Sequence, residues 1–195
     1  MNPEQRQGAA LRFAPLWSAL IGAGGGAVYW LSTQLWPANV AVVLAMLAIA
    51  LLRSGLEGRR PLAPAALPGL VLAVLVKYNA LMALSAASLP FAAPANVALG
   101  FIMIAGLACS RALAVSAAPV SHADLGLALL VGFAPAALIG LPGLVGLVAA
   151  IGARIAVVAY VKRARPSASE PELDVLREVA EVCFYLGALA AWGYA

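Results

Sequence analysis

Residues 51–68, LLRSGLEGRRPLAPAALP, form the longest polar interruption between two apolar runs of this chain. The runs on either side, at 37–52 and 69–88, approach the roughly 20 residues that a helix needs to cross the hydrocarbon core of a bilayer. The interruption holds three arginines but a single acid, Glu57. It therefore predicts a basic loop between two membrane helices, and as the main polar break it is where chemistry is first expected.

The composition of the whole chain places it among integral membrane proteins. Of its 195 residues, 64% are hydrophobic and only 10% are charged, and its mean hydropathy is +0.98, well outside the range of soluble domains. No region combines low hydrophobicity with high net charge, so residues 1–195 are expected to form a single membrane domain. The polar residues 1–12 lead into an apolar run without a signal-peptide cleavage site, so that run is expected to be retained.

The apolar runs predict an all-α fold, a polytopic bundle of about seven transmembrane helices. Pro135, Pro142 and Gly143 break the pattern of the fifth and sixth runs, so a kinked or re-entrant fifth segment is an open alternative. The expected spans are 14–32, 37–52, 69–88, 95–116, 124–141, 143–161 and 175–194.

The basic residues predict how this bundle is oriented. Cytoplasmic loops of membrane proteins carry an excess of Lys and Arg. With a cytoplasmic N-terminus, the turns on the opposite side, at 33–36, 89–94 and 142, carry no charge at all. The C-terminus is then expected on the outer side. The basic residues that fall on the cytoplasmic side are Arg6, Arg12, Arg53, Arg59, Arg60, Lys162, Arg163 and Arg165.

A glycine pair in the first run has the spacing that lets two membrane helices approach closely. Gly22 and Gly26 are four residues apart and share one face of the expected helix. A phosphate-binding glycine loop would require a preceding strand, which the sequence does not provide. The pattern therefore favours helix packing over a ligand role.

Ionisable residues inside the expected spans are the strongest functional signal. A charge at this depth is costly, so such residues normally face the bundle interior and have a partner or a task. Lys77 lies in the third span, Arg111 in the fourth, Arg154 in the sixth, and Glu178 and Glu181 in the last. Arg111 and Arg154 lie close enough to span ends that their side chains could instead extend to the membrane surface.

The last helix concentrates the acidic residues on one face. Asp174, Glu178, Glu181 and Tyr185 are spaced at four, three and four residues, which aligns three carboxylates and a phenol. Such a face could bind a cation, orient a phosphate-bound metal, or pair with basic residues of the other spans in an ion-pair network without chemistry. Asp174 could also be a solvated residue near the helix start, where the dipole favours a negative charge.

Several classes of function are excluded by what the sequence lacks. There is no Ser/His/Asp set, no paired histidine ligands, no phosphate loop and no basic patch with interleaved aromatics, so a nucleic acid partner is not expected. Cys109 and Cys183 lie in apolar runs and match no zinc or redox spacing. His122 is a lone loop histidine for which a solvated side chain is expected.

The order of these features resembles that of the cobalamin synthases (adenosylcobinamide-GDP ribazoletransferases) of bacterial membranes. The similarity covers most of the chain in the same order, and it includes an embedded basic residue, a Ser-Arg pair and paired glutamates. The segments that carry it are LRFAPLWSALIGAGGGAVYWLSTQLWP at 11–37, VAVVLAMLAIALLRSG at 40–55, ALPGLVLAVLVKYNALMAL at 66–84, CSRALAVSAAPVSHAD at 109–124 and EVAEVCFYLGALA at 178–190.

The resemblance implies a particular reaction and cofactor. The family transfers α-ribazole, or its phosphate, onto adenosylcobinamide-GDP and releases GMP in a reaction that depends on Mg²⁺. Its carboxylates are expected in an acid-rich motif, H-x-D-G-x-A-D-x-x-D-G, after the second span. In this chain that motif is absent, and Glu57 is the only acid at its place.

Site residues follow from the resemblance together with the embedded charges. If the chain is active, the candidate Mg²⁺ ligands are Glu178, Glu181 and Asp174. The candidate catalytic residues are Glu178, Glu181, Arg111 and Lys77, and the candidate substrate-binding residues are Arg111, Lys77 and Arg154.

Three hypotheses for the function follow. The first is a cobalamin synthase-like transferase in the bacterial cytoplasmic membrane, acting on adenosylcobinamide-GDP and α-ribazole. The second is an inactive paralogue that serves as a scaffold or corrinoid-binding subunit beside other membrane proteins of the late cobalamin pathway. The third is a small transporter, because interior charges also mark substrate pathways.

Overall fold

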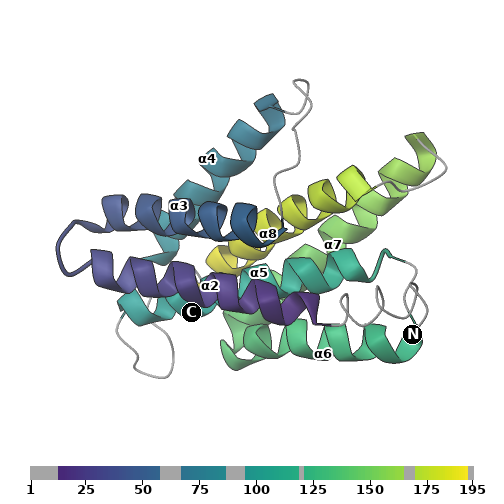
Figure 1. Ribbon diagram of the computed structural model, residues 1–195, viewed down its shortest axis with the longest axis horizontal. Helices are drawn as coiled ribbons and strands as arrows, with labels where there is room; N and C mark the ends of the chain where they lie inside the picture. Colours follow the sequence, from purple (N-terminus) through teal and green to yellow (C-terminus); the bar gives the residue numbers. More distant parts are fainter. Residues whose placement is uncertain (1–12, 58–66, 87–94, 119–120, 165–169, 193–195) are drawn as a thin grey trace.

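The computed structural model describes residues 13–57, 67–86, 95–118, 121–164 and 170–192 (Figure 1). In these segments the regular structure is helical throughout, which confirms the all-α class, and each expected span corresponds to one helix. Arg6, Arg12, Arg59, Arg60 and Arg165 lie outside the described residues. The helices are α2 (Ala14–Ser32), α3 (Ala38–Glu57), α4 (Leu67–Leu84), α5 (Ala95–Val115), α6 (His122–Leu138), α7 (Leu141–Ala164) and α8 (Glu170–Trp192).

The helices have the length and apolar surface of a membrane protein. Three contain apolar stretches long enough to cross a bilayer, Ala38–Gly55 in α3, Val97–Val115 in α5 and Leu141–Arg163 in α7. Shorter apolar stretches occupy Gly69–Leu84 in α4 and His122–Leu138 in α6. Large aliphatic side chains of α3 and α7 are exposed on the outside of the bundle, as expected for a surface that faces lipid.

Helix α5 is the centre of the bundle. It packs against α2, α6, α7 and α8, and its side chains Leu99, Ile102, Met103 and Leu107 are completely buried. An apolar helix without a polar face can be buried on all sides, and α5 has a low density of polar residues before Ser110. It therefore provides the surface on which the other helices are arranged.

The glycines of α2 allow that helix to contact α5 backbone to backbone. A Cβ atom added at Gly26 would lie 2.8 Å from the Gly100 Cα, and one added at Gly22 would lie 2.7 Å from the Ile104 Cα. Neither contact leaves room for a side chain. The predicted close-packing role of Gly22 and Gly26 is confirmed, and the partner helix is α5.

Helices α6 and α7 form a hairpin joined by a tight turn. Pro135 lies inside α6, but the helix continues to Leu138. Gly140 then adopts a positive φ of 83°, which is strained for residues with a side chain. The residues at this break thus form a turn between two distinct helices.

Helix α4 is enclosed mainly along its second half. Its second half is packed through Ala80, Leu81 and Leu84, and it contacts α8 and α3. Val71 and Leu72 in its first half are exposed, and Figure 1 shows α4 diverging from the direction of α3. Side chains from α3, α4 and α8 meet in one polar cluster.

Candidate functional site: an ion-pair ring between three helices

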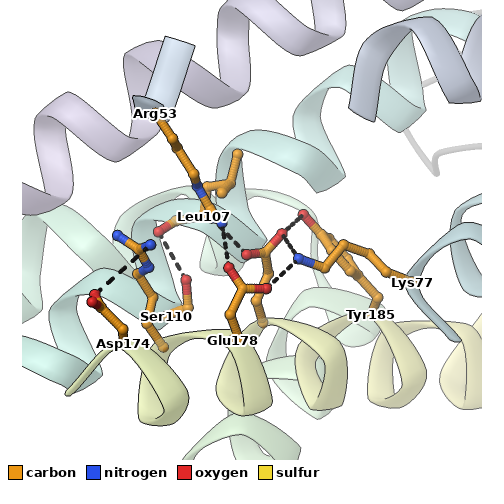
Figure 2. A network of polar contacts seen from close by, with 9 residues as sticks. Arg53, Lys77, Leu107, Ser110, Asp174, Glu178 and Tyr185 are labelled. Carbon is orange, nitrogen blue, oxygen red and sulfur yellow. Dashed lines mark hydrogen bonds and ion pairs between the residues drawn. The ribbon is translucent and has the colours of Figure 1, made fainter. Parts of the chain in front are cut away.

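Four charged side chains from α3, α4 and α8 form a closed ion-pair ring, defined here as Arg53, Lys77, Glu178 and Glu181 (Figure 2). Arg53 reaches Glu178 Oε1 through Nη1 and Glu181 Oε2 through Nη2, each at 2.6 Å. The Lys77 Nζ lies 2.8 Å from Glu178 Oε2 and 3.1 Å from Glu181 Oε1. Each cation therefore contacts both carboxylates, and each carboxylate contacts both cations.

The positions of these residues on their helices explain why they meet. Glu178 and Glu181 are three residues apart on α8, so their side chains project from one face. Arg53 extends from the last turns of α3, while Lys77 comes from the middle of α4. Figure 2 shows Arg53 and Lys77 reaching Glu178 from different helices. The ring thereby connects α3 and α4 to α8.

Burial makes charge balance essential in the ring. The side chains of Arg53, Lys77 and Glu181 are 14%, 11% and 1% exposed, whereas that of Glu178 is 25% exposed. Removing ions from water costs several kcal/mol per ion unless they are well paired. Two positive and two negative charges give the ring no net charge, and the short contacts offset the cost of desolvation.

Tyr185 adds a fifth polar group to the most buried part of the ring. Its hydroxyl donates a hydrogen bond of 3.2 Å to Glu181 Oε1. Its ring lies against Gly106 of α5, where an added Cβ would be 2.5 Å from Tyr185 Cε1, and contacts Phe184 edge to face at 6.0 Å between centroids. The absence of a side chain at Gly106 lets the phenol reach Glu181.

The ring residues do not fit the magnesium ion that the family resemblance implies. Mg²⁺ binds through carboxylate, phosphate and water oxygens, but all four carboxylate oxygens of Glu178 and Glu181 contact Arg53 or Lys77. Asp174, the third candidate ligand, lies 4.0 Å from the guanidinium of Arg177. Within the described segments, no three His, Cys, Asp or Glu side chains are grouped so that they could hold a metal.

The structure places the other candidate residues separately. Arg154 of α7 donates from Nε to Ser116 Oγ at 2.7 Å and from Nη2 to the Ser116 carbonyl at 3.1 Å. It thus binds the C-terminal end of α5, where unpaired carbonyls and the helix dipole favour a cation. Arg111 is half-buried on α5, directly after Ser110. Of the three candidate substrate-binding residues, Lys77 lies in the ring and Arg154 caps a helix.

This contact of Arg154 predicts a modest structural effect. In Arg154→Gln, both hydrogen bonds to Ser116 are lost, so the free energy of unfolding is expected to fall by about 1 kcal/mol. Denaturant titration in detergent, monitored by circular dichroism, measures this. Lys162→Gln, a loss of charge near the exposed end of the same helix, is the control and should have little effect. A loss of several kcal/mol would contradict a capping role.

Arg53 is the site residue that sequence analysis missed. The sequence places Arg53 in the cytoplasmic loop, because the second apolar run is predicted to end at residue 52. In the structure α3 continues to Glu57, and Arg53 follows the buried residues Ala41, Ala45 and Ile49 at four-residue intervals. That spacing is the signal by which a helical pattern could have placed Arg53 on the inward face.

Comparisons of the chain with protein-family models, with curated proteins and with solved structures found no match. The interpretation of the site therefore depends on its residues and their geometry.

Proposed function

We propose that the chain is a cobalamin synthase-like membrane protein that serves the late cobalamin pathway as a non-catalytic scaffold or corrinoid-binding subunit. The observation that carries this proposal is the neutralisation of Glu178 and Glu181 by Arg53 and Lys77. The ordered resemblance to the family supports the pathway. The ion pairs argue against the family's reaction.

The chemistry of that reaction explains the weight given to the ion pairs. Phosphoryl transfer depends mainly on positioning and on stabilising charge that develops on phosphate oxygens, and metal ions supply much of that stabilisation. A bound Mg²⁺ needs several oxygen ligands. Here the two glutamates already satisfy two side-chain cations, and the acid-rich motif is absent from the sequence. Among the described residues, the carboxylates are therefore not arranged to hold the metal that such a transfer needs.

The proposal includes a location in the bacterial cytoplasmic membrane, with seven spans and a cytoplasmic N-terminus. The positive-inside pattern supports this orientation. Arg53 would then lie near the cytoplasmic end of α3, and Glu178 in the cytoplasmic half of α8. The ring would be accessible to partners and ligands from the cytoplasmic side.

The proposal predicts that the purified protein does not release GMP. Protein in detergent or nanodiscs would be incubated with adenosylcobinamide-GDP, α-ribazole and Mg²⁺, and GMP would be measured by chromatography. An active cobalamin synthase under the same conditions is the positive control. We expect no turnover above a membrane blank, because no described group of carboxylates is arranged to hold the metal.

Turnover above the blank would contradict the non-catalytic proposal and favour the transferase. If no turnover is found, equilibrium dialysis of the same sample with adenosylcobinamide-GDP separates the two non-catalytic roles, because a corrinoid-binding subunit retains the ligand and a scaffold does not. Uptake of the corrinoid into proteoliposomes would favour the transporter. That candidate is supported by the charged ring inside the bundle.

A further inference from the structure

The two glutamates of the ion-pair ring are held to very different degrees. Glu181 is 1% exposed and contacts Arg53, Lys77 and Tyr185. Glu178 is 25% exposed, and its oxygens contact one cation each, Arg53 at Oε1 and Lys77 at Oε2. Glu178 is therefore the carboxylate that an incoming ligand reaches first and displaces at the lower cost.

The two cations present a defined arrangement of donors to Glu178. The Arg53 Nη1 lies 2.6 Å from one oxygen, and the Lys77 Nζ lies 2.8 Å from the other. The two donors thus converge on the carboxylate of Glu178, whose two oxygens share a single negative charge. Arginine and lysine are also the residues that most often bind phosphate groups in proteins.

Charge balance identifies the class of ligand that would replace Glu178. A phosphodiester carries one negative charge on two non-bridging oxygens, as a carboxylate does, so the exchange leaves the buried site neutral. A phosphomonoester carries about −1.5 to −2 charges near neutral pH and would leave excess negative charge beside the buried Glu181. Uncompensated buried charge is strongly unfavourable.

We propose that Arg53 and Lys77 form a binding site for a phosphodiester group, and that Glu178 occupies this site in the described structure as an internal substitute. On binding, Glu178 turns away from the two cations, while Glu181 remains as their buried counter-ion. The direction of entry is the side on which Glu178 is exposed. Val71 and Leu72 in the first half of α4 are exposed as well, and α4 diverges from α3 (Figure 1).

Two sources supply a phosphodiester to a membrane protein, namely a phospholipid headgroup and a soluble ligand. The site is independent of the proposed function, because a phosphodiester would bind whether or not the chain binds a corrinoid. Phosphatidylglycerol is the lipid probe, and glycerophosphoglycerol, its headgroup without acyl chains, is the soluble probe. Each carries one phosphodiester charge.

The test is a titration of the full chain in an uncharged detergent with each probe, with the apparent Kd taken from the shift of the thermal unfolding midpoint. Wild type is expected to bind at least one probe. Glu178→Gln removes the internal competitor, so its affinity is expected to rise by about tenfold or more. Arg53→Gln and Lys77→Gln are expected to lose about tenfold or more, because each removes one of the two charged donors.

Two further variants control for a general effect of removing an acid from α8 and for misfolding of Arg53→Gln. Asp174→Asn also removes an acid from α8, but its carboxylate lies beside Arg177, and its affinity for the probes should match wild type. Arg53→Lys keeps the charge and loses the two-pronged guanidinium, so it should bind more weakly even if Arg53→Gln fails to fold.

The outcomes are decisive in both directions. Binding of the lipid alone assigns the site to a headgroup, whereas binding of both probes shows that the phosphodiester itself suffices. Absence of binding by both wild type and Glu178→Gln overturns the proposal. Binding that Arg53→Lys and Lys77→Gln leave unchanged also overturns it, because the ligand would then contact some other part of the protein.

Discussion

Replacement of Glu181 by glutamine is expected to lower the free energy of unfolding by about 3–5 kcal/mol, the usual effect of removing one partner of a buried ion pair. Glu181 is 1% exposed and contacts both Arg53 and Lys77. Glutamine keeps the shape and an oxygen for Tyr185, but leaves one uncompensated positive charge in the bundle. Unfolding by SDS titration in mixed micelles, followed by circular dichroism, measures the loss.

Asp174→Asn provides the matched control for this experiment. The side chain of Asp174 is 47% exposed and lies 4.0 Å from Arg177, so its loss should change stability by no more than about 1 kcal/mol. A second variant tests the cause. Glu181→Leu combined with Arg53→Met removes one charge of each sign and should recover part of the stability. If the Glu181→Gln variant were as stable as Asp174→Asn, the ring would not contribute to the stability of the bundle as proposed.

Replacement of Gly26 by alanine is expected to destabilise the protein by about 1–3 kcal/mol, as overpacking of a close contact usually does. The new Cβ would lie 2.8 Å from the Cα of Gly100. Because that atom belongs to the backbone of α5, no side-chain rotation relieves the contact, and α2 and α5 must move apart. The thermal unfolding midpoint in detergent is the measurement.

Gly152→Ala is the control for the same substitution in another membrane helix. An added Cβ at Gly152 meets nothing within 4 Å, and alanine is favoured over glycine inside a helix by about 0.5–1 kcal/mol. Gly152→Ala should therefore be neutral or slightly stabilising. Equal effects of the two variants would mean that the α2–α5 contact does not require glycine.

The contents of the candidate site were only partly predictable from the sequence. The spacing of Glu178, Glu181 and Tyr185 on one helical face follows from helix geometry, and the structure brings these three together with Lys77. An ion-pair network was one of the interpretations left open for this face. Its second cation was not identified, because Arg53 is separated from Glu178 by 125 residues, and no local pattern states which helices become neighbours.

The remaining charged residues illustrate the same limit. Arg154 was expected to serve substrate binding or to extend to the membrane surface. In the structure Arg154 donates to Ser116 at the end of α5, a contact that depends on how α7 packs beside α5. Because an unpaired charge inside a membrane is costly, the sequence alone indicates that an embedded arginine has a partner. Which residue is the partner depends on how the helices pack.

The sequence by itself determined the all-α class, the positions of the apolar helices and the close packing through Gly22 and Gly26, because composition and helical periodicity are local properties. Only the tertiary structure decided that Arg53, at the start of the polar stretch 51–68, belongs to α3 and enters the bundle, and that Arg53 and Lys77 each contact both glutamates of α8. The physical reason is that a buried charge is stable only beside an opposite charge. Which opposite charge lies beside it depends on how α3, α4 and α8 pack together.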